Sequence, residues 1–154
     1  LRFDAVASLS QNYFADFTQL NQIYDASWNP VGTETTRFDG NTIAGFPGEM
    51  VNLKLSYDIK AFAANVNWQY IGEQYLDNTE NRDRMIDSYG VLNAVVSGNL
   101  SGLIGLNGLK VSLFLNNILD ETYETAGYYD AWAGENFYYP AAGRNFYLNF
   151  ELSL

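Results

Sequence analysis

Residues 109–154 read LKVSLFLNNILDETYETAGYYDAWAGENFYYPAAGRNFYLNFELSL, and the last ten of them decide the class of secondary structure. In this last part apolar and polar side chains alternate strictly, which is the period of a β-strand. The apolar set is Phe146, Leu148, Phe150, Leu152 and Leu154, and the polar set is Asn145, Tyr147, Asn149, Glu151 and Ser153. By itself this pattern indicates only a strand with one apolar face, because a soluble sheet that covers a core shows it too.

The same alternation predicts five further strands upstream. They span about residues 2–17, 51–58, 61–70, 89–100 and 109–116. The connections between the strands are alternately long and short. The long ones are residues 19–48, 73–87 and 121–142, and the short ones are residues 58–60 and 101–108. The first long connection is rich in Pro and Gly without a helical period, and we predict a loop there, far above the usual length of about four to six residues.

The composition excludes several classes of function. The net charge is −10 with only 8 Lys and Arg residues, whereas nucleic-acid binding needs clustered cations. Cysteine and histidine are both absent, which removes disulfides, thiolate nucleophiles, the usual general base and the commonest zinc ligand. No window reaches the roughly 18 uninterrupted apolar residues of a membrane helix. We therefore expect no enzyme activity, no cofactor and no nucleic-acid partner.

The acidic stretch 77–88 is compared with a calcium loop. An EF-type loop that begins at Asp77 needs Gly at its sixth position and Glu at its twelfth. The sequence has Arg82 and Ser88 at these positions, so we expect no metal site. The acidic balance of the chain is interpreted as a solvated outer surface.

Two regularities favour a membrane barrel over a soluble sheet. The connections alternate in length, and the polar faces carry small amides and hydroxyls, both of which are typical of outer-membrane barrels. Aromatic residues also fall where interfacial girdles would lie, with Tyr57 and Phe62 beside a short turn and Trp68, Tyr70 and Phe146 beside long connections. We predict an all-β fold, an antiparallel transmembrane β-barrel. The alternative is a soluble β-sandwich or lipocalin-like binding module, which would bury the same apolar faces in a core.

Six strands are too few for a complete barrel. The smallest outer-membrane barrels close at about 8 strands, and an open edge in lipid leaves backbone groups unpaired at a cost of several kcal/mol each. We therefore expect residues 1–154 to be the C-terminal part of a larger barrel, with further residues upstream of Leu1, where alternation has already begun. The competing reading is a complete small barrel, an anchor or adhesin, with two more strands inside residues 19–48.

Two motifs flank the last long connection. The segment NNILD at 116–120, followed by Tyr123, resembles the penultimate-strand signature of TonB-dependent outer-membrane receptors, and PAAGRNF at 140–146 resembles the same family's entry into the closing strand. Two positions depart from the family pattern, because Leu119 stands where Phe is commoner and Leu154 where a terminal aromatic is usual. The matching positions are Asn116, Asn117, Asp120, Tyr123, Pro140, Gly143, Arg144 and Phe146. Since Asn and Asp bond to nearby backbone at strand ends, we expect these positions to shape the barrel rim without touching ligand.

The resemblance implies a function and a set of partners. It implies a 22-stranded barrel that encloses an N-terminal plug, in the outer membrane of a Gram-negative bacterium, with this chain as the last six strands. Such a receptor takes up a scarce ligand of the siderophore, cobalamin or glycan type with energy from the inner membrane. The implied partners are outer-membrane lipid and lipopolysaccharide, the plug, a TonB-type coupling protein acting through the plug, the barrel-assembly machinery acting on the C-terminal strand, and the ligand.

The residues expected at the ligand lie in the last long connection. Exposed aromatic side chains are costly unless they meet a partner, and external loops commonly carry binding residues. The predicted ligand contacts are Tyr128, Tyr129, Trp132, Phe137, Tyr138 and Tyr139. The alternative is that these rings pack on neighbouring loops and at the lipid interface. The side chains expected to face the lumen and the plug are Asn52, Lys54, Asn65, Asn67, Asn93, Asn99 and Lys110.

Overall fold

The computed structural model describes residues 1–101 and 108–153. Six antiparallel strands form one sheet in the order β1-β4-β5-β8-β9-β12. Their bounds are β1 Arg2–Leu9, β4 Glu49–Ile59, β5 Phe62–Ile71, β8 Tyr89–Asn99, β9 Leu109–Asn116 and β12 Asn145–Leu152. All six predicted strands are therefore present, although the first ends at Leu9 and not near Phe17. Most of the predicted connection 101–108, and the terminal Leu154, lie outside the described residues.

The strand register separates a polar face from an apolar face. Residues that pair directly across strands share a face, and Lys54 pairs with Asn67, which pairs with Asn93. Asn99 pairs with Lys110, and by the period of two both side chains lie on the same face as Asn93. The side chains predicted for the lumen thus all lie on one face of the sheet: Asn52, Lys54, Asn65, Asn67, Asn93, Asn99 and Lys110.

The apolar face has no protein layer over it in the described part of the chain. Phe146 is 70 % exposed and Phe150 is 66 % exposed, and both belong to this face. Among the described residues, the buried apolar side chains are Phe38, Ile86 and Val91. A β-sandwich would have buried the apolar face against a second sheet. In the part of the chain that the structure describes, no helix is long and apolar enough to cross a membrane.

Aromatic rings of the apolar face lie over glycines of β8. Phe62 pairs with Gly98, where an added Cβ would come within 2.9 Å of the Phe62 ring. At Gly90 an added Cβ would come within 3.1 Å of the Trp68 indole. The two glycines therefore leave room for rings at both ends of the apolar face, which are the positions predicted for the aromatic girdles.

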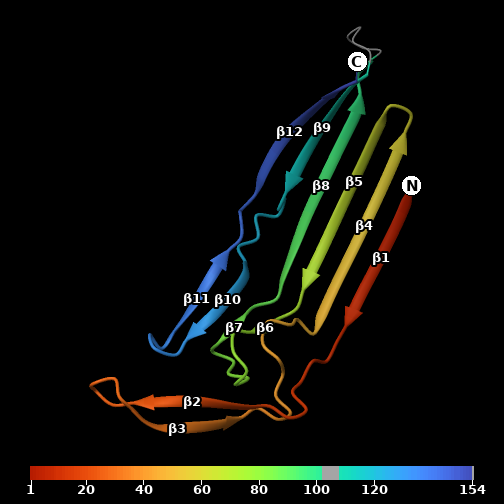
Figure 1. Cartoon of the computed structure of the whole chain (residues 1–154). Coiled ribbons are helices and arrows are strands. Elements are labelled where there is room, and N and C mark those ends of the chain that lie inside the picture. The colour runs from red at the N-terminus through yellow and green to blue at the C-terminus, as the bar shows by residue number, and fades with distance from the viewer. Residues whose placement is uncertain (102–107, 154) are drawn as a thin grey trace.

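The long connections lie together at one end of the sheet, and the β4–β5 turn lies at the other (Figure 1). They are not simple loops, because each contains a small antiparallel hairpin. The hairpins are β2 Thr18–Tyr24 with β3 Pro30–Arg37, β6 Gln74–Tyr75 with β7 Met85–Ile86, and β10 Glu124–Asp130 with β11 Glu135–Pro140. The three segments are called here the first connection (10–48), the second connection (72–88) and the third connection (117–144).

The prediction that residues 19–48 form a loop without strands was wrong. The carboxylate of Asp25 accepts hydrogen bonds from the backbone N–H groups of Ser27 and Asn29, and this local turn connects β2 to β3. Both faces of the hairpin are largely exposed and polar, so no alternation of hydrophobicity reveals it in the sequence. The two strands form a separate sheet and add no strand to the six-stranded one, contrary to the small-barrel reading.

Candidate ligand-contact surface

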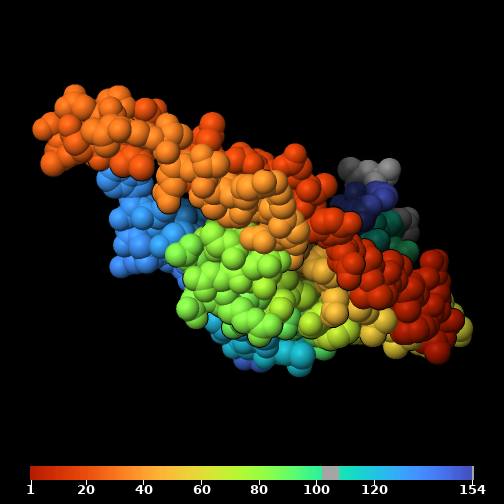
Figure 2. Space-filling model, turned by 90° about the horizontal axis from the view of Figure 1, so that it is seen from below, coloured from red at the N-terminus to blue at the C-terminus, as the bar shows by residue number. Residues whose placement is uncertain are grey.

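The second connection is bonded to both of its neighbours. Towards the first connection, Asn41 Nδ2 donates to the carbonyl oxygen of Asn78 at 2.8 Å. The backbone N–H and hydroxyl of Thr42 both donate to Glu80 Oε1, at 2.7 and 2.6 Å, which holds the pKa of the Glu80 carboxyl below its usual value. Figure 2, which views this end of the molecule, shows the second connection (green) against the first (orange) and the third (blue). The second connection is therefore the centre of this end of the sheet.

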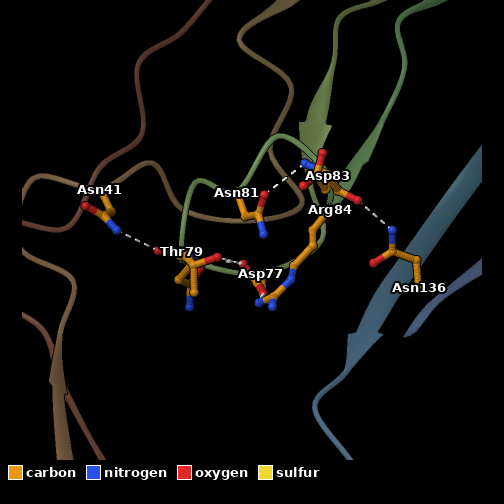
Figure 3. A network of polar contacts seen from close by, with 8 residues as sticks. Asn41, Asp77, Thr79, Asn81, Asp83, Arg84 and Asn136 are labelled. Carbon is orange, nitrogen blue, oxygen red and sulfur yellow. Dashed lines mark hydrogen bonds and ion pairs between the residues drawn. The ribbon is translucent and has the colours of Figure 1, made fainter. Parts of the chain in front are cut away.

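The β10–β11 hairpin docks on the second connection through polar side chains (Figure 3). Asn136 Nδ2 donates to the carbonyl oxygen of Asp83 at 2.7 Å, and the hydroxyl of Tyr138 donates to the carbonyl oxygen of Met85 at 3.1 Å. The guanidinium of Arg84 lies 3.4 Å from the ring centroid of Tyr129, a cation–π contact. The hairpin is thus held by backbone acceptors and by one cation.

Within the acidic stretch 77–88, Arg84 forms an ion pair with Asp77. Arg84 Nη1 lies 2.6 Å from Asp77 Oδ2. Burial raises the pKa of the Asp77 carboxyl, but hydrogen bonds from Thr79 and Arg84 outweigh burial and hold this pKa below its usual value. In the described residues, no three Asp or Glu side chains are grouped as a metal ion would need.

The predicted ligand contacts separate onto two faces of the β10–β11 hairpin. Tyr129 and Tyr138 are on the face that docks on the second connection. Tyr128, Phe137 and Tyr139 are on the opposite face, where they are between 40 % and 58 % exposed. The ring of Tyr128 stacks on Phe137 with centroids 5.3 Å apart and lies 6.4 Å from that of Tyr139. Tyr129 and Tyr138 therefore pack on a neighbouring connection, and ligand contact by the predicted residues stays a prediction.

Trp132, the sixth predicted ligand contact, stacks on Trp28, a residue that the sequence analysis did not single out. Trp132, at the tip of the β10–β11 hairpin, is 79 % exposed and stacks on Trp28 at the tip of the β2–β3 hairpin. Trp28 has a left-handed backbone (φ 64°) and also contacts Tyr24, with ring centroids 5.8 Å apart. The sequence signal was a lone Trp within the turn at residues 25–29, but nothing local showed which distant tip it meets.

Asn117 is the most enclosed of the family-signature residues. It is 3 % exposed and has a left-handed backbone (φ 50°), a conformation that Asn tolerates. Its side-chain oxygen accepts from the backbone N–H of Glu121 at 2.9 Å, and its Nδ2 donates to the carbonyl oxygens of Glu121 and Ala142 at 2.8 and 3.3 Å. Its own N–H donates to Asn93 Oδ1 at 2.9 Å. Asn117 thus ties the end of β9 to β8 and to the approach to β12.

The two motifs also bond to each other. Asp120 Oδ1 accepts from the backbone N–H of Arg144 at 2.8 Å, and the Arg144 guanidinium lies 3.7 Å from Asp120 Oδ2. A Cβ at Gly143 would come within 3.3 Å of Asp120 Oδ1, so the close approach suits a residue without a side chain. The Asp120 side chain therefore fixes the start of β12 relative to the end of β9.

The remaining signature residues lie at the same rim. Tyr123 stacks on Tyr89 of β8 with ring centroids 4.3 Å apart, and its carbonyl oxygen accepts from Ala141 N–H at 2.9 Å. Asn116 donates to Asn145 Oδ1 at 3.0 Å on the polar face. The structure places the other two as well: Pro140 ends β11 and Phe146 lies on the apolar face.

The charge of the protein is concentrated at this end. The three long connections contain 14 of the 18 Asp and Glu residues and four of the eight Lys and Arg residues. The rest of the chain has equal numbers of acids and bases, so the connections carry the whole net charge of −10. Three of their four arginines, Arg37, Arg84 and Arg144, are already paired with carboxylates. The field at this end therefore favours cations and opposes anions.

A cavity of about 470 Å³ lies between the first connection, the second connection and the ends of β4 and β5. Its lining combines two carboxylates with aromatic rings: Tyr13, Phe46, Glu49, Tyr70, Glu73 and Tyr75. Glu49 and Tyr70 belong to the apolar face of the sheet by register. The cavity is separate from the exposed rings of the third connection, which contributes none of its lining residues.

Solved receptor structures share this fold. The siderophore receptor PiuA from Acinetobacter baumannii matches with a TM-score of 0.62 and 20% identity over 76% of this chain and 16% of its own. The unliganded ferric citrate transporter FecA matches with a TM-score of 0.59 and 20% identity, over 77% of this chain and 19% of its own length. The closed form of the ferric-catecholate import receptor Fiu from E. coli K12 matches with a TM-score of 0.54 and 15% identity, over 94% of this chain and 19% of its own length.

The likeness concerns a part of each receptor and is one of fold. This chain spans less than a fifth of the length of the three receptors. No protein-family model and no curated protein matches the sequence. The open six-stranded sheet, with one polar and one uncovered apolar face, corresponds to a piece of a barrel wall. The chain therefore has the fold of part of the transmembrane β-barrel of TonB-dependent siderophore receptors, the family that its two motifs resemble.

Proposed function

We propose that this chain is the C-terminal part of the barrel of an outer-membrane receptor that takes up a scarce ligand, driven from the inner membrane by a TonB-type coupling protein. The observation that carries the proposal is the aromatic surface at the end where the long connections meet. It consists of Tyr128, Phe137, Tyr139 and the Trp28–Trp132 pair. We propose that these five side chains contact the ligand.

The polar face supports passage through the barrel. It carries amides and hydroxyls, and a hollow of about 360 Å³ on it is bordered by Lys54, Asn65, Asn67, Asn93, Ala94 and Val95. Such groups form hydrogen bonds to a partner without the strong attraction of clustered charges. We propose that this face contacts an N-terminal plug, and that the coupling protein acts on the plug from the periplasm.

The apolar face supports a location in the outer membrane of a Gram-negative bacterium. Side chains such as Phe146 and Phe150 are exposed and form a continuous apolar layer, which lipid would cover. We propose that the acidic connections meet lipopolysaccharide through divalent ions and that the assembly machinery acts on the closing strand. The proposed protein is a transporter and performs no chemistry on its ligand.

Uptake by cells tests the proposal. The full-length receptor is expressed in Gram-negative cells with and without the coupling protein, and accumulation is measured for labelled ferric citrate, cyanocobalamin, maltopentaose and spermine. We expect one of the four to accumulate only with the coupling protein. The double variant Tyr128→Ala/Tyr139→Ala should accumulate it about tenfold less, since 1.4 kcal/mol of lost contact is a factor of ten.

The matched control for this experiment is Tyr57→Ala. Tyr57 is also an exposed aromatic residue, but it lies on the apolar face beside the short β4–β5 turn. This variant should transport normally once its amount in the membrane is taken into account. Accumulation that does not depend on the coupling protein, or that Tyr57→Ala reduces as much as the double variant, contradicts the proposal.

A further inference from the structure

We infer that the exposed face of the β10–β11 hairpin binds an organic cation, a ligand that carries ammonium or guanidinium groups. The inference rests on the proposed function and adds the chemical class of the ligand. The surface is called here the aromatic face, and it is formed by Tyr128, Phe137 and Tyr139 together with Asp130 and Glu135.

The geometry places rings and carboxylates on one side of the hairpin. Tyr128 pairs with Phe137, and Asp130 pairs with Glu135 two residues along, so their side chains lie on the same side. Asp130 Oδ1 caps the hairpin turn by accepting from the backbone N–H of Trp132 at 2.8 Å, which fixes this carboxylate at the end of the row of rings. Ring faces beside carboxylates are the combination that attracts an organic cation in water.

The opposite side of the same hairpin already holds a cation in this way. The guanidinium of Arg84 lies 3.4 Å above the ring of Tyr129 and is 2.6 Å from the carboxylate of Asp77. One ring and one carboxylate therefore suffice for an arginine of the protein itself. The aromatic face offers three rings and two carboxylates, and Tyr128 and Tyr139 are 44% and 58% exposed.

Charge complementarity separates a cation from other ligands. The three connections have ten more acids than bases, and three of their four arginines are engaged by carboxylates. An anionic iron chelate would approach against this field and would find few free guanidinium groups, which are the usual partners of carboxylate ligands. A cation is drawn to the same surface, and its association is weakened by salt.

Calorimetry on the purified full-length receptor tests the inference, with spermine, ferric citrate and maltopentaose as probes. We expect spermine to bind and the other two not to bind. Tyr128→Ala should weaken spermine binding at least tenfold, Tyr128→Phe should retain it because the ring remains, and Glu135→Gln should weaken it about threefold. The control Asp58→Asn removes a carboxylate beside the short turn at the far end of the sheet and should have no effect.

The outcomes distinguish the ligand class from the transport role. Tighter binding of ferric citrate or maltopentaose than of spermine, or spermine binding that Tyr128→Ala leaves unchanged, overturns the inference. If one of these other probes binds and Tyr128→Ala abolishes its binding, the surface is a ligand site but the ligand is not a cation. If spermine binds as expected and cells show no accumulation that depends on the coupling protein, the cation surface stands and the proposed transport is wrong.

Discussion

The indole rings of Trp28 and Trp132 stack with centroids 5.0 Å apart and planes 11° from parallel. They join the tips of the β2–β3 and β10–β11 hairpins, which come from the first and third connections. Each side chain is more than half exposed, so the stack is a bridge between two protruding hairpins and not part of a core. The bridge joins the first connection directly to the third, in addition to the contacts that each makes with the second connection.

Replacing one ring should separate the two tips. We expect Trp132→Ala to remove about 0.5–1.5 kcal/mol of pairing free energy and to make the β2–β3 hairpin more accessible to protease in the proposed full-length receptor. Trp28→Ala should have the same effect, and the double variant should add little, because either change removes the whole contact. Fully additive effects of the two variants would show that the rings do not interact in solution.

Asn117 should be the most sensitive of the signature residues. We expect Asn117→Ala to cost about 1–3 kcal/mol, because the buried Asn117 side chain makes three part-buried hydrogen bonds to the backbone of Glu121 and Ala142, and the substitution removes them. The measurement is the temperature at which the faster-migrating, folded form of the unboiled receptor is lost on a gel. Asn116→Ala is the control, since the Asn116 bond to Asn145 is exposed, and an equal loss in both variants would contradict the assigned role.

Gly127 permits the close docking of the β10–β11 hairpin. A Cβ at this position would come within 2.7 Å of the Phe137 carbonyl oxygen and 2.8 Å of Leu76 Cδ2. Gly127→Ala should therefore cost about 1–3 kcal/mol and should loosen the contact between Arg84 and Tyr129. The control is Gly32→Ala in β3, where an added Cβ meets nothing within 4 Å. Hydrogen exchange of residues 124–140 should rise in the first variant only.

Acid should loosen the second connection. The carboxyls of Asp77 and Glu80 have pKa values below their usual 3.8 and 4.5. A lowered pKa means that the contribution to stability is complete above the usual value and is lost as pH falls through the lowered one. We therefore expect protection of residues 72–88 from hydrogen exchange to be constant above about pH 5 and to fall between about pH 4 and 2.

The variant Glu80→Gln separates this titration from general acid unfolding. Its amide oxygen still accepts from Thr42 but does not titrate, so the step in protection near residues 42 and 80 should become smaller. The barrel strands serve as the internal reference. If their protection falls at the same pH as that of residues 72–88, the loss comes from global unfolding and the assignment to Asp77 and Glu80 is wrong.

Much of the barrel wall was predictable from the sequence because strand alternation is local. Each side chain of β4, β5, β8, β9 and β12 lies on the face that its place in the period of two requires. The rim motifs were predictable for a related reason, since Asn117 and Asp120 bond mainly to backbone within the third connection and at its end. The β2–β3 hairpin was missed because strands that are exposed on both faces have no hydrophobic period, and β6 and β7 are each two residues long, too short to show a period.

The sequence by itself determined the strands, their two faces and the aromatic character of the third connection. The tertiary structure alone decided what each ring contacts: Tyr129 and Tyr138 dock on the second connection, Tyr128 stacks on Phe137 beside Tyr139, and Trp132 meets Trp28. The physical reason is range. Alternation depends on neighbours one and two residues away. What covers a hairpin face is a connection that is distant in sequence, and this connection becomes adjacent to the hairpin only when the intervening strands have paired.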